Sequence, residues 1–351
     1  MFPYIITAGL LALLAVLGKP YREIRVIWWL VFVLLIVFVG LRHNVGMDWN
    51  NYLGMHSAVG QRDFIEALEV TEPGYAILIY IGNLLDGQIY VTNILAGSIS
   101  LVGLMLFARR SPNPFMALAY AFPYLIVVMF MSGARQATAL GVIFVMYAYW
   151  DRLGIVGKTL LVLLATMFHT SAIIFLSFVA LGMRISNALK VFMASVFTSI
   201  SIYYLVNAGR STVYQRYFEE AADAASGAAF HVALVAIPAA AYFIFPSARD
   251  KLFPTPFLRH LAFAALLTVL LIPFSTITAS RLSTYWFPMA VWVWASLPLA
   301  FGHNVRALVK LVLALVTIFI TWAWLSLSNS STAWLPYENA IFVEPYRLDF
   351  I

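Results

Sequence analysis

Long apolar segments separated by short polar connections recur along the whole chain. Helices that span a bilayer need about 17–25 mostly apolar residues, and the period-two alternation of a transmembrane barrel is absent from this sequence. The pattern therefore predicts an all-α, polytopic integral membrane protein with about 10–12 membrane helices, some of them re-entrant or broken. The predicted apolar segments are 2–17, 26–41, 73–85, 90–107, 115–132, 136–150, 158–183, 188–206, 229–246, 257–274, 284–300 and 307–326.

Composition supports the same fold class. Of 351 residues, 63% are hydrophobic and only 10% are charged, and the mean hydropathy is +0.90. Soluble domains carry about 25% charged residues, so a soluble fold is excluded. The N-terminal stretch lacks a basic region and a clear cleavage site, so we expect it to be retained as the first helix. No internal repeat is visible, and we predict a single membrane domain over residues 1–351.

Several kinds of chemistry are excluded at this stage. The chain has no Cys, which rules out disulfides, thiol chemistry and Cys-based metal sites. HExxH, DxD and phosphate-binding Gly-rich patterns do not occur in their required context. The lack of a carboxylate cluster argues against a catalytic divalent metal, and we predict no metal and no cofactor. The formal net charge of +6 lies mostly in predicted cytoplasmic loops and does not indicate nucleic acid as a partner.

Basic residues orient the chain in the bilayer, because cytoplasmic loops are enriched in Lys and Arg. Three of them follow the first apolar segment, between Lys19 and Arg25, so that loop should be cytoplasmic and the N-terminus external. Counting from both ends, we predict external loops over 42–72 and 207–228 and an external C-terminal tail over 327–351.

The middle of the chain allows two topologies. If every segment crosses fully, 11 Lys and Arg residues lie inside and 10 outside. If one of the short segments within 73–107, and segment 158–183, do not complete a crossing, 14 lie inside and 7 outside. We favour the second topology, because Glu72-Pro73-Gly74 precedes one doubtful segment and His169 interrupts the other. Its external basic residues are Arg42, Arg62, Arg135, Arg210, Arg216, Arg281 and Arg347.

The external basic residues of this topology are all Arg. A guanidinium group binds phosphate oxygens in a bidentate manner that a Lys ammonium cannot match. The external face is therefore suited to phosphate groups.

Arg135-Gln136 and His169 border or interrupt strongly apolar stretches. A charged side chain at the centre of a membrane helix costs about 2.5–3.5 kcal/mol, so such residues usually face a wet cavity and carry function. His169 is suited to shuttle a proton or bind phosphate. The structural alternatives are a hydrogen-bonded core histidine and an Arg135 side chain that extends to the interface.

Three further polar clusters are candidates. In the loop after the second segment, Gly46 provides a turn, and Asp48 and Tyr52 share a helix face; Arg42 and His43 precede them. Glu72 opens the third segment, and several hydroxyl residues surround Arg281 and Tyr285. The structural alternatives are a helix cap for Asp48 or Glu72 and an interfacial anchor for Arg42. The tail around Trp334 and 344–346 could act as a lid.

Taken together, these motifs resemble the EpsG family of bacterial polysaccharide polymerases, which are Wzy-like proteins. The matching positions occur in order over nearly the whole chain. They are Arg42, Gly46, Asp48 and Tyr52, then Glu72-Pro73-Gly74-Tyr75, Arg135-Gln136 with Ala139, His169 with Ser171-Ala172, Arg281 with Tyr285, and Pro336-Tyr337.

The resemblance implies an enzyme of the bacterial inner membrane that joins oligosaccharide repeat units carried on undecaprenyl diphosphate. The active site would face the periplasm or exterior, and the product would be O-antigen or exopolysaccharide. The implied partners are the lipid-linked oligosaccharide, the bilayer, and a chain-length regulator and flippase.

The resemblance also implies roles for the candidate residues. Three arginines, Arg42, Arg135 and Arg281, would bind the diphosphate and stabilise its charge, and His169 would assist. Asp48 or Glu72 would act as the base toward the acceptor hydroxyl. The remaining candidates for substrate binding are His43, Tyr52, Gln136 and Tyr285.

Other functional classes stay open. A flippase or transporter of lipid-linked sugars could also place Arg in a central cavity, but it should show two related halves. A glycan ligase would transfer the chain to a lipid core, and a sugar O-acyltransferase would need its catalytic residues near a cytoplasmic donor. A purely structural membrane subunit is disfavoured by the number of polar residues at membrane depth.

Overall fold

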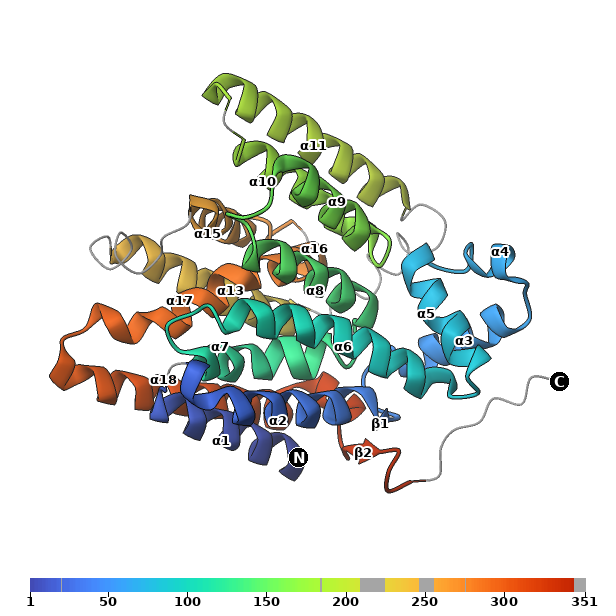
Figure 1. The fold of residues 1–351 in the computed structure, drawn as a ribbon, viewed down its shortest axis with the longest axis horizontal. Helices are drawn as coiled ribbons and strands as arrows, with labels where there is room; N and C mark the ends of the chain where they lie inside the picture. Colours follow the sequence, from blue (N-terminus) through green and yellow to red (C-terminus); the bar gives the residue numbers. More distant parts are fainter. Residues whose placement is uncertain (20, 184, 209–224, 246–255, 275, 344–351) are drawn as a thin grey trace.

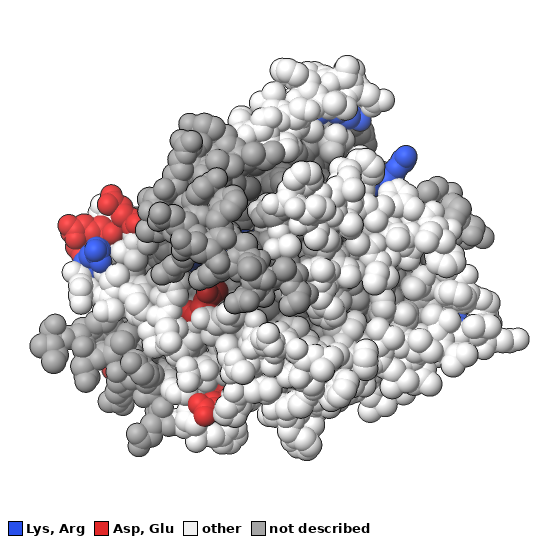
Figure 2. All heavy atoms as spheres, turned by 180° about the vertical axis from the view of Figure 1, so that it is seen from behind, with Lys and Arg blue, Asp and Glu red and all other residues white. Residues whose placement is uncertain are grey.

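The structure is a computed structural model that describes residues 1–351 except 20, 184, 209–224, 246–255, 275 and 344–351. It confirms an all-α polytopic membrane protein (Figure 1). Within the described residues, three helices are long and apolar enough to cross a membrane by length and composition: the Glu23–Gly40 part of α2, α6 and α18. Further helices are apolar but shorter, and on the face seen in Figure 2 few charged side chains interrupt the apolar and polar white surface.

Most of the longer helices pack side by side and run along the same general direction (Figure 1). The elements outside the site are α1 (Phe2–Leu17), α2 (Tyr21–Gly40), α6 (Gln88–Ala108), α7 (Pro114–Ala121), the π-helix η1 (Phe122–Met129), α11 (Asn187–Ala208), α13 (Ala225–Ile244), α15 (Pro256–Val269), α17 (Phe287–Ser296), η4 (Leu297–Ala300) and α18 (His303–Leu327). At the centre α6 packs on α8 (Ala134–Ala148). Gly103 and Gly141 allow this, because a Cβ on either would overlap backbone of the other helix.

The segment 73–85 does not cross the bundle; the favoured topology predicted this for one of the two short segments within 73–107. It forms α5 (Pro73–Leu84), whose 12 residues span roughly 18 Å, against about 30 Å of hydrocarbon. With α3 (Trp49–Gly60) and α4 (Phe64–Ala67) it lies at one end of the molecule (Figure 1). The next helix, α6, begins at that same end, because Tyr90 contacts His43 there.

The segment 158–183 is broken and re-entrant, also as predicted. It forms α9 (Ile155–Thr166), η2 (Thr170–Ile174) and α10 (Phe175–Leu181). His169 separates the two halves in an extended conformation, with φ −158° and ψ 119°. The chain then returns to its starting side, because a Cβ on Gly182, after α10, would lie 2.7 Å from the ring of Trp150, before α9.

Side-chain contacts rule out the topology in which every segment crosses. That topology places Arg109 and the Lys19–Arg25 loop on opposite sides, yet the Arg109 guanidinium carbon lies 5.9 Å from the centre of the Tyr21 ring. Lys310 also reaches this loop, since its ammonium group lies against Gly18. Arg109 and the loop therefore share one end of the bundle, and the candidate site lies at the other. Which end faces the cytosol remains a prediction.

The C-terminal segment forms a strap instead of the expected lid. Beyond α18 it includes η5 (Asn329–Ala333) and strand β2 (Glu338–Asn339), which pairs antiparallel with β1 (Arg42–His43). Trp334 is 2% exposed and donates from its indole to the Val127 carbonyl at 2.8 Å. This anchoring explains the difference, because a lid must be free to move. Residues 344–351 of the predicted tail, with Arg347, lie outside the described residues. So do residues 209–224 of the predicted loop 207–228, with Arg210 and Arg216.

Candidate functional site

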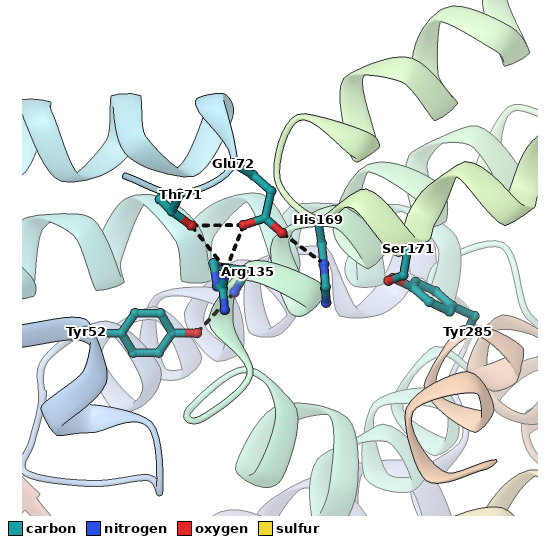
Figure 3. A network of polar contacts seen from close by, with 7 residues as sticks. All are labelled: Tyr52, Thr71, Glu72, Arg135, His169, Ser171 and Tyr285. Carbon is teal, nitrogen blue, oxygen red and sulfur yellow. Dashed lines mark hydrogen bonds and ion pairs between the residues drawn. The ribbon is translucent and has the colours of Figure 1, made fainter. Parts of the chain in front are cut away.

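Glu72 lies at the centre of a polar network at the end of the bundle that carries α3 to α5 (Figure 3). Its Oε2 lies 2.8 Å from Nη1 of Arg135 and its Oε1 lies 3.1 Å from Nδ1 of His169. Thr71 donates its hydroxyl to Oε2 at 2.9 Å, and the same Arg135 nitrogen donates to the Thr71 hydroxyl at 3.1 Å. One carboxylate therefore holds a guanidinium and an imidazole side by side.

The sequence around Glu72 explains why it reaches His169. Pro73 begins α5 at a position where a missing N–H is tolerated. The next residue, Gly74, donates its N–H to the Met167 carbonyl at 2.7 Å, and a Cβ there would lie only 2.8 Å from that oxygen. Glycine therefore lets the start of α5 rest against the end of α9. Since His169 follows Met167 by two residues, this contact brings the two side chains together.

The network remains partly open to solvent. The exposed fraction is 31% for the Arg135 side chain, 25% for His169 and 14% for Glu72. Burial alone would raise the pKa of Glu72, but the hydrogen bond from His169 and the charge of Arg135 outweigh it and hold that pKa well below its usual range. Glu72 is therefore a stable anion that keeps two nitrogen groups facing an accessible space.

Asp48 also lies beside the start of α8, but in a different environment from Glu72. Its Oδ2 accepts a hydrogen bond from the Ser132 hydroxyl at 3.4 Å, and its backbone N–H donates to that hydroxyl at 3.3 Å. Gly46 allows the approach with φ 103°, and any Cβ there would overlap the Met131 carbonyl. Burial raises the pKa of Asp48 more than Arg135, the Ser132 hydrogen bond and Arg281 lower it.

The first turn of α3 links Asp48 to Arg135. Four residues after Asp48, the Tyr52 hydroxyl accepts the Arg135 backbone N–H at 3.4 Å. On the same helix face His56 is fully buried, and its Nδ1 lies 2.9 Å from Oδ1 of Asn83 at the end of α5. Burial lowers the pKa of His56 to about 4, so it is neutral at pH 7. This contact fixes α3 against α5 and thereby fixes Asp48 relative to Glu72.

The opposite wall of the site comes from α16 (Thr276–Ser283) and η3 (Thr284–Trp286). The Gln136 amide donates to the Arg281 carbonyl at 3.1 Å, which places Arg281 beside the start of α8. The Tyr285 hydroxyl forms a hydrogen bond with the Ser171 hydroxyl, next to His169 (Figure 3). Arg281 and Tyr285 thus come from the far part of the chain and contact Gln136 and Ser171, which neighbour Arg135 and His169 in the sequence.

Arg42 and His43 are two predicted site residues whose hydrogen-bond partners lie outside the Glu72 network. Arg42 is 1% exposed, and it donates to the Val39 carbonyl at 2.7 Å and to Oδ1 of Asn93 at 3.0 Å. His43 has its Nδ1 2.6 Å from the Tyr90 hydroxyl. Because the Arg42 donors face α2 and α6, we do not retain this residue as a diphosphate ligand. It stabilises the β1 region instead.

Four contributors escaped the sequence analysis as separate candidates: His56, Thr71, Asn83 and Asn93. Thr71 could have been noticed because it precedes Glu72 directly. His56 could have been noticed because it lies four residues after Tyr52 and therefore shares its helix face. For the two asparagines no signal along the chain exists, since their partners are on other helices.

The described residues include no group of three or more His, Asp or Glu side chains that could hold a metal ion. Among the described residues, the arginines beside the start of α8 are Arg135 and Arg281, and the His169 imidazole lies next to Arg135 on Glu72. The arrangement can therefore bind an anionic group beside two carboxylates of opposite pKa behaviour.

The model of the EpsG family matches residues 25–339, nearly the whole chain and every candidate named above. Neither the curated proteins nor the solved structures contain a match to it.

Proposed function

Because the chain belongs to the EpsG family, a family of Wzy-like polysaccharide polymerases, we propose that it polymerises oligosaccharide repeat units carried on undecaprenyl diphosphate. The observation that carries this proposal is the network in which Glu72 holds Arg135 and His169, with Asp48 and Arg281 beside the same helix start. It offers cations for a diphosphate and a carboxylate for a hydroxyl within one site.

The proposed reaction is a glycosyl transfer. A hydroxyl oxygen of the incoming lipid-linked unit bonds to the anomeric carbon of the growing chain. The bond from that carbon to the phosphate oxygen breaks, and undecaprenyl diphosphate leaves with the electron pair. A carboxylate of the site, Asp48 or Glu72, takes the hydroxyl proton.

Arg135 and Arg281 bind the diphosphate in this proposal, and His169 assists. Fixed cationic donors stabilise charge that develops on a leaving group, and guanidinium groups suit phosphate oxygens in particular. Since a diphosphate is a good leaving group, the chemistry does not require a metal.

We further propose that the site faces the periplasm or exterior of a bacterial inner membrane. The support is the distribution of charge: the end away from the site carries Arg109 and the basic loop after α1, and such residues favour the cytoplasmic side. Lipid-linked repeat units, a chain-length regulator and a flippase would then be the partners on that face.

The test is a gel of surface polysaccharide from a deletion strain complemented with wild-type or Arg135→Ala protein. The proposal expects single repeat units from the deletion and from Arg135→Ala, and long polymer from the wild type. Absence of any repeat unit at the surface would instead indicate a flippase. Long polymer that accumulates on the lipid carrier would indicate a ligase. Polymer of normal length that lacks acyl groups would indicate an acyltransferase.

A further inference from the structure

We infer that Asp48 is the base that accepts the proton of the acceptor hydroxyl, and that Glu72 is a positioning residue for Arg135 and His169. This assignment rests on the proposed function. It follows from the different surroundings of the two carboxylates, both of which interact with the charge of Arg135.

Both oxygens of Glu72 are already engaged. Oε2 receives Arg135 at 2.8 Å and the Thr71 hydroxyl at 2.9 Å, and Oε1 lies 3.1 Å from His169. A proton on the carboxylate would remove its charge and so weaken its ion pair with Arg135. An anion stabilised this strongly is a weak base. A general base works best when its pKa lies near the working pH. Its lowered pKa agrees with that geometry.

The Asp48 carboxylate has fewer hydrogen-bond and ion-pair partners than the Glu72 carboxylate. Among the described residues, its side chain accepts one hydrogen bond, from Ser132 at 3.4 Å, and no Arg, Lys or His nitrogen lies within ion-pair distance. It is half-buried, and its pKa is raised. Protonation of Asp48 therefore breaks little, and its raised pKa makes it a stronger base than Glu72.

The position of Asp48 fits a role toward the acceptor. It is attached to the turn before α8 through Ser132, three residues before Arg135, whereas Glu72 binds the Arg135 guanidinium from α5. His169 shares the Glu72 carboxylate with Arg135 and so lies with the cations that face the leaving group. The proposed base, Asp48, and the proposed diphosphate-binding groups, Arg135 and His169, are thus different residues. They lie close together around the start of α8.

The proton then follows a simple course. The acceptor hydroxyl gives its proton to a carboxylate oxygen of Asp48 as its oxygen bonds to the anomeric carbon. The diphosphate departs with the electrons of the broken bond, and Asp48 afterwards releases the proton to water. Glu72 stays ionised throughout.

The test uses purified full-length protein in lipid nanodiscs with lipid-linked single repeat units extracted from the deletion strain. Asp48→Asn should lower turnover at saturating substrate by about 100-fold or more, whereas Glu72→Gln should lower it by about tenfold. Formate should restore turnover to Asp48→Ala and not to Glu72→Ala. The acid limb of the turnover–pH profile should persist in Glu72→Gln.

Two exposed carboxylates that flank α4 provide matched controls. Asp63→Asn and Glu69→Gln should leave turnover within about twofold of the wild type, because neither residue contacts the site. All variants should insert equally by immunoblot, and Asp48→Glu should recover part of the loss. Rescue of Glu72→Ala but not Asp48→Ala, or turnover of Asp48→Asn near that of the wild type, would overturn the assignment. A wild-type protein that makes no polymer here would refute the proposed function itself.

Discussion

The two ends of the bundle use their cations in different ways. At the site end, Arg135 and His169 share the Glu72 carboxylate at 2.8 and 3.1 Å. At the other end the cations lie over aromatic rings, with the Lys158 nitrogen 4.0 Å from the centre of the Trp150 ring and the Arg110 guanidinium carbon 4.9 Å from that of Tyr149. The 15 residues of α8, roughly 22 Å, connect the two ends.

This difference indicates that the cations at the site end serve the reaction and those at the other end anchor the helices. A cation over an aromatic ring at a membrane interface holds a helix at its depth and contributes about 0.5–1 kcal/mol when exposed. A cation paired with a half-buried carboxylate keeps one fixed position, and its remaining N–H groups stay available to a ligand. Substitutions at the two ends should therefore have unequal effects on function.

The largest contrast is expected between Arg135→Ala and Arg109→Ala. Loss of Arg135 should reduce polymer by at least about 100-fold, because fixed donors to developing charge contribute roughly 3–4 kcal/mol. Loss of Arg109, which contacts the Tyr149 hydroxyl at 3.1 Å, should leave polymer within about twofold. Polymer length distributions from cells with matched protein levels measure both, and equal losses would contradict the comparison.

The next effect should come from Gly74. In Gly74→Val the side chain would overlap the Met167 carbonyl, so α5 must move away from α9 and separate Glu72 from His169. We expect about a tenfold fall in turnover with normal insertion. Gly154→Ala is the matched control, since a Cβ there meets nothing within 4 Å and the substitution should change little. Undiminished turnover in Gly74→Val would show that the contact is dispensable.

A smaller effect concerns stability and pH. Because the pKa of Glu72 is lower in the folded protein, its ion pairs stabilise the fold above the ordinary value of 4.5, and this contribution is lost as the pH falls below it. Glu72→Gln should lower the free energy of unfolding by about 1–2 kcal/mol at pH 7. Thermal unfolding in detergent should show the difference shrinking below pH 4.5. A difference that grew toward acid would have the wrong sign.

The smallest effect is expected at the anchoring end. Lys158→Gln removes the charge above Trp150 and should change the free energy of unfolding by less than about 1 kcal/mol. Polymer should be unchanged. The same thermal unfolding assay measures this variant beside Glu72→Gln, and a larger loss from Lys158→Gln would reverse the ranking.

Much of the bundle was predictable because membrane helices appear in the sequence as long apolar segments. The apolar segment 2–17 became α1, and the interruptions at Pro73 and His169 correctly marked segments that do not cross. The π-helix of η1 was not predicted, since its apolar residues also suit an α-helix. Hydropathy reports burial in lipid and not the exact backbone form.

The site was only partly predictable. The residue types of Asp48, Arg135 and His169 stood out because ionisable groups at membrane depth are costly. Their grouping depended on tertiary contacts such as that between Gly74 and Met167, which no local pattern encodes. The same limit explains Arg42: it looked like Arg135 along the chain, but Asn93 on another helix binds it.

The central claim is that the Glu72–Arg135 site and Asp48 open to the outside of the cell. Since the chain has no Cys, single Cys variants report position without background. Met47→Cys lies beside Asp48 and is 65% exposed, and Asp151→Cys lies in an exposed turn at the other end. In intact spheroplasts a membrane-impermeant maleimide should label Met47→Cys, and should label Asp151→Cys only after permeabilisation. The reverse pattern would place the site in the cytosol and contradict the account.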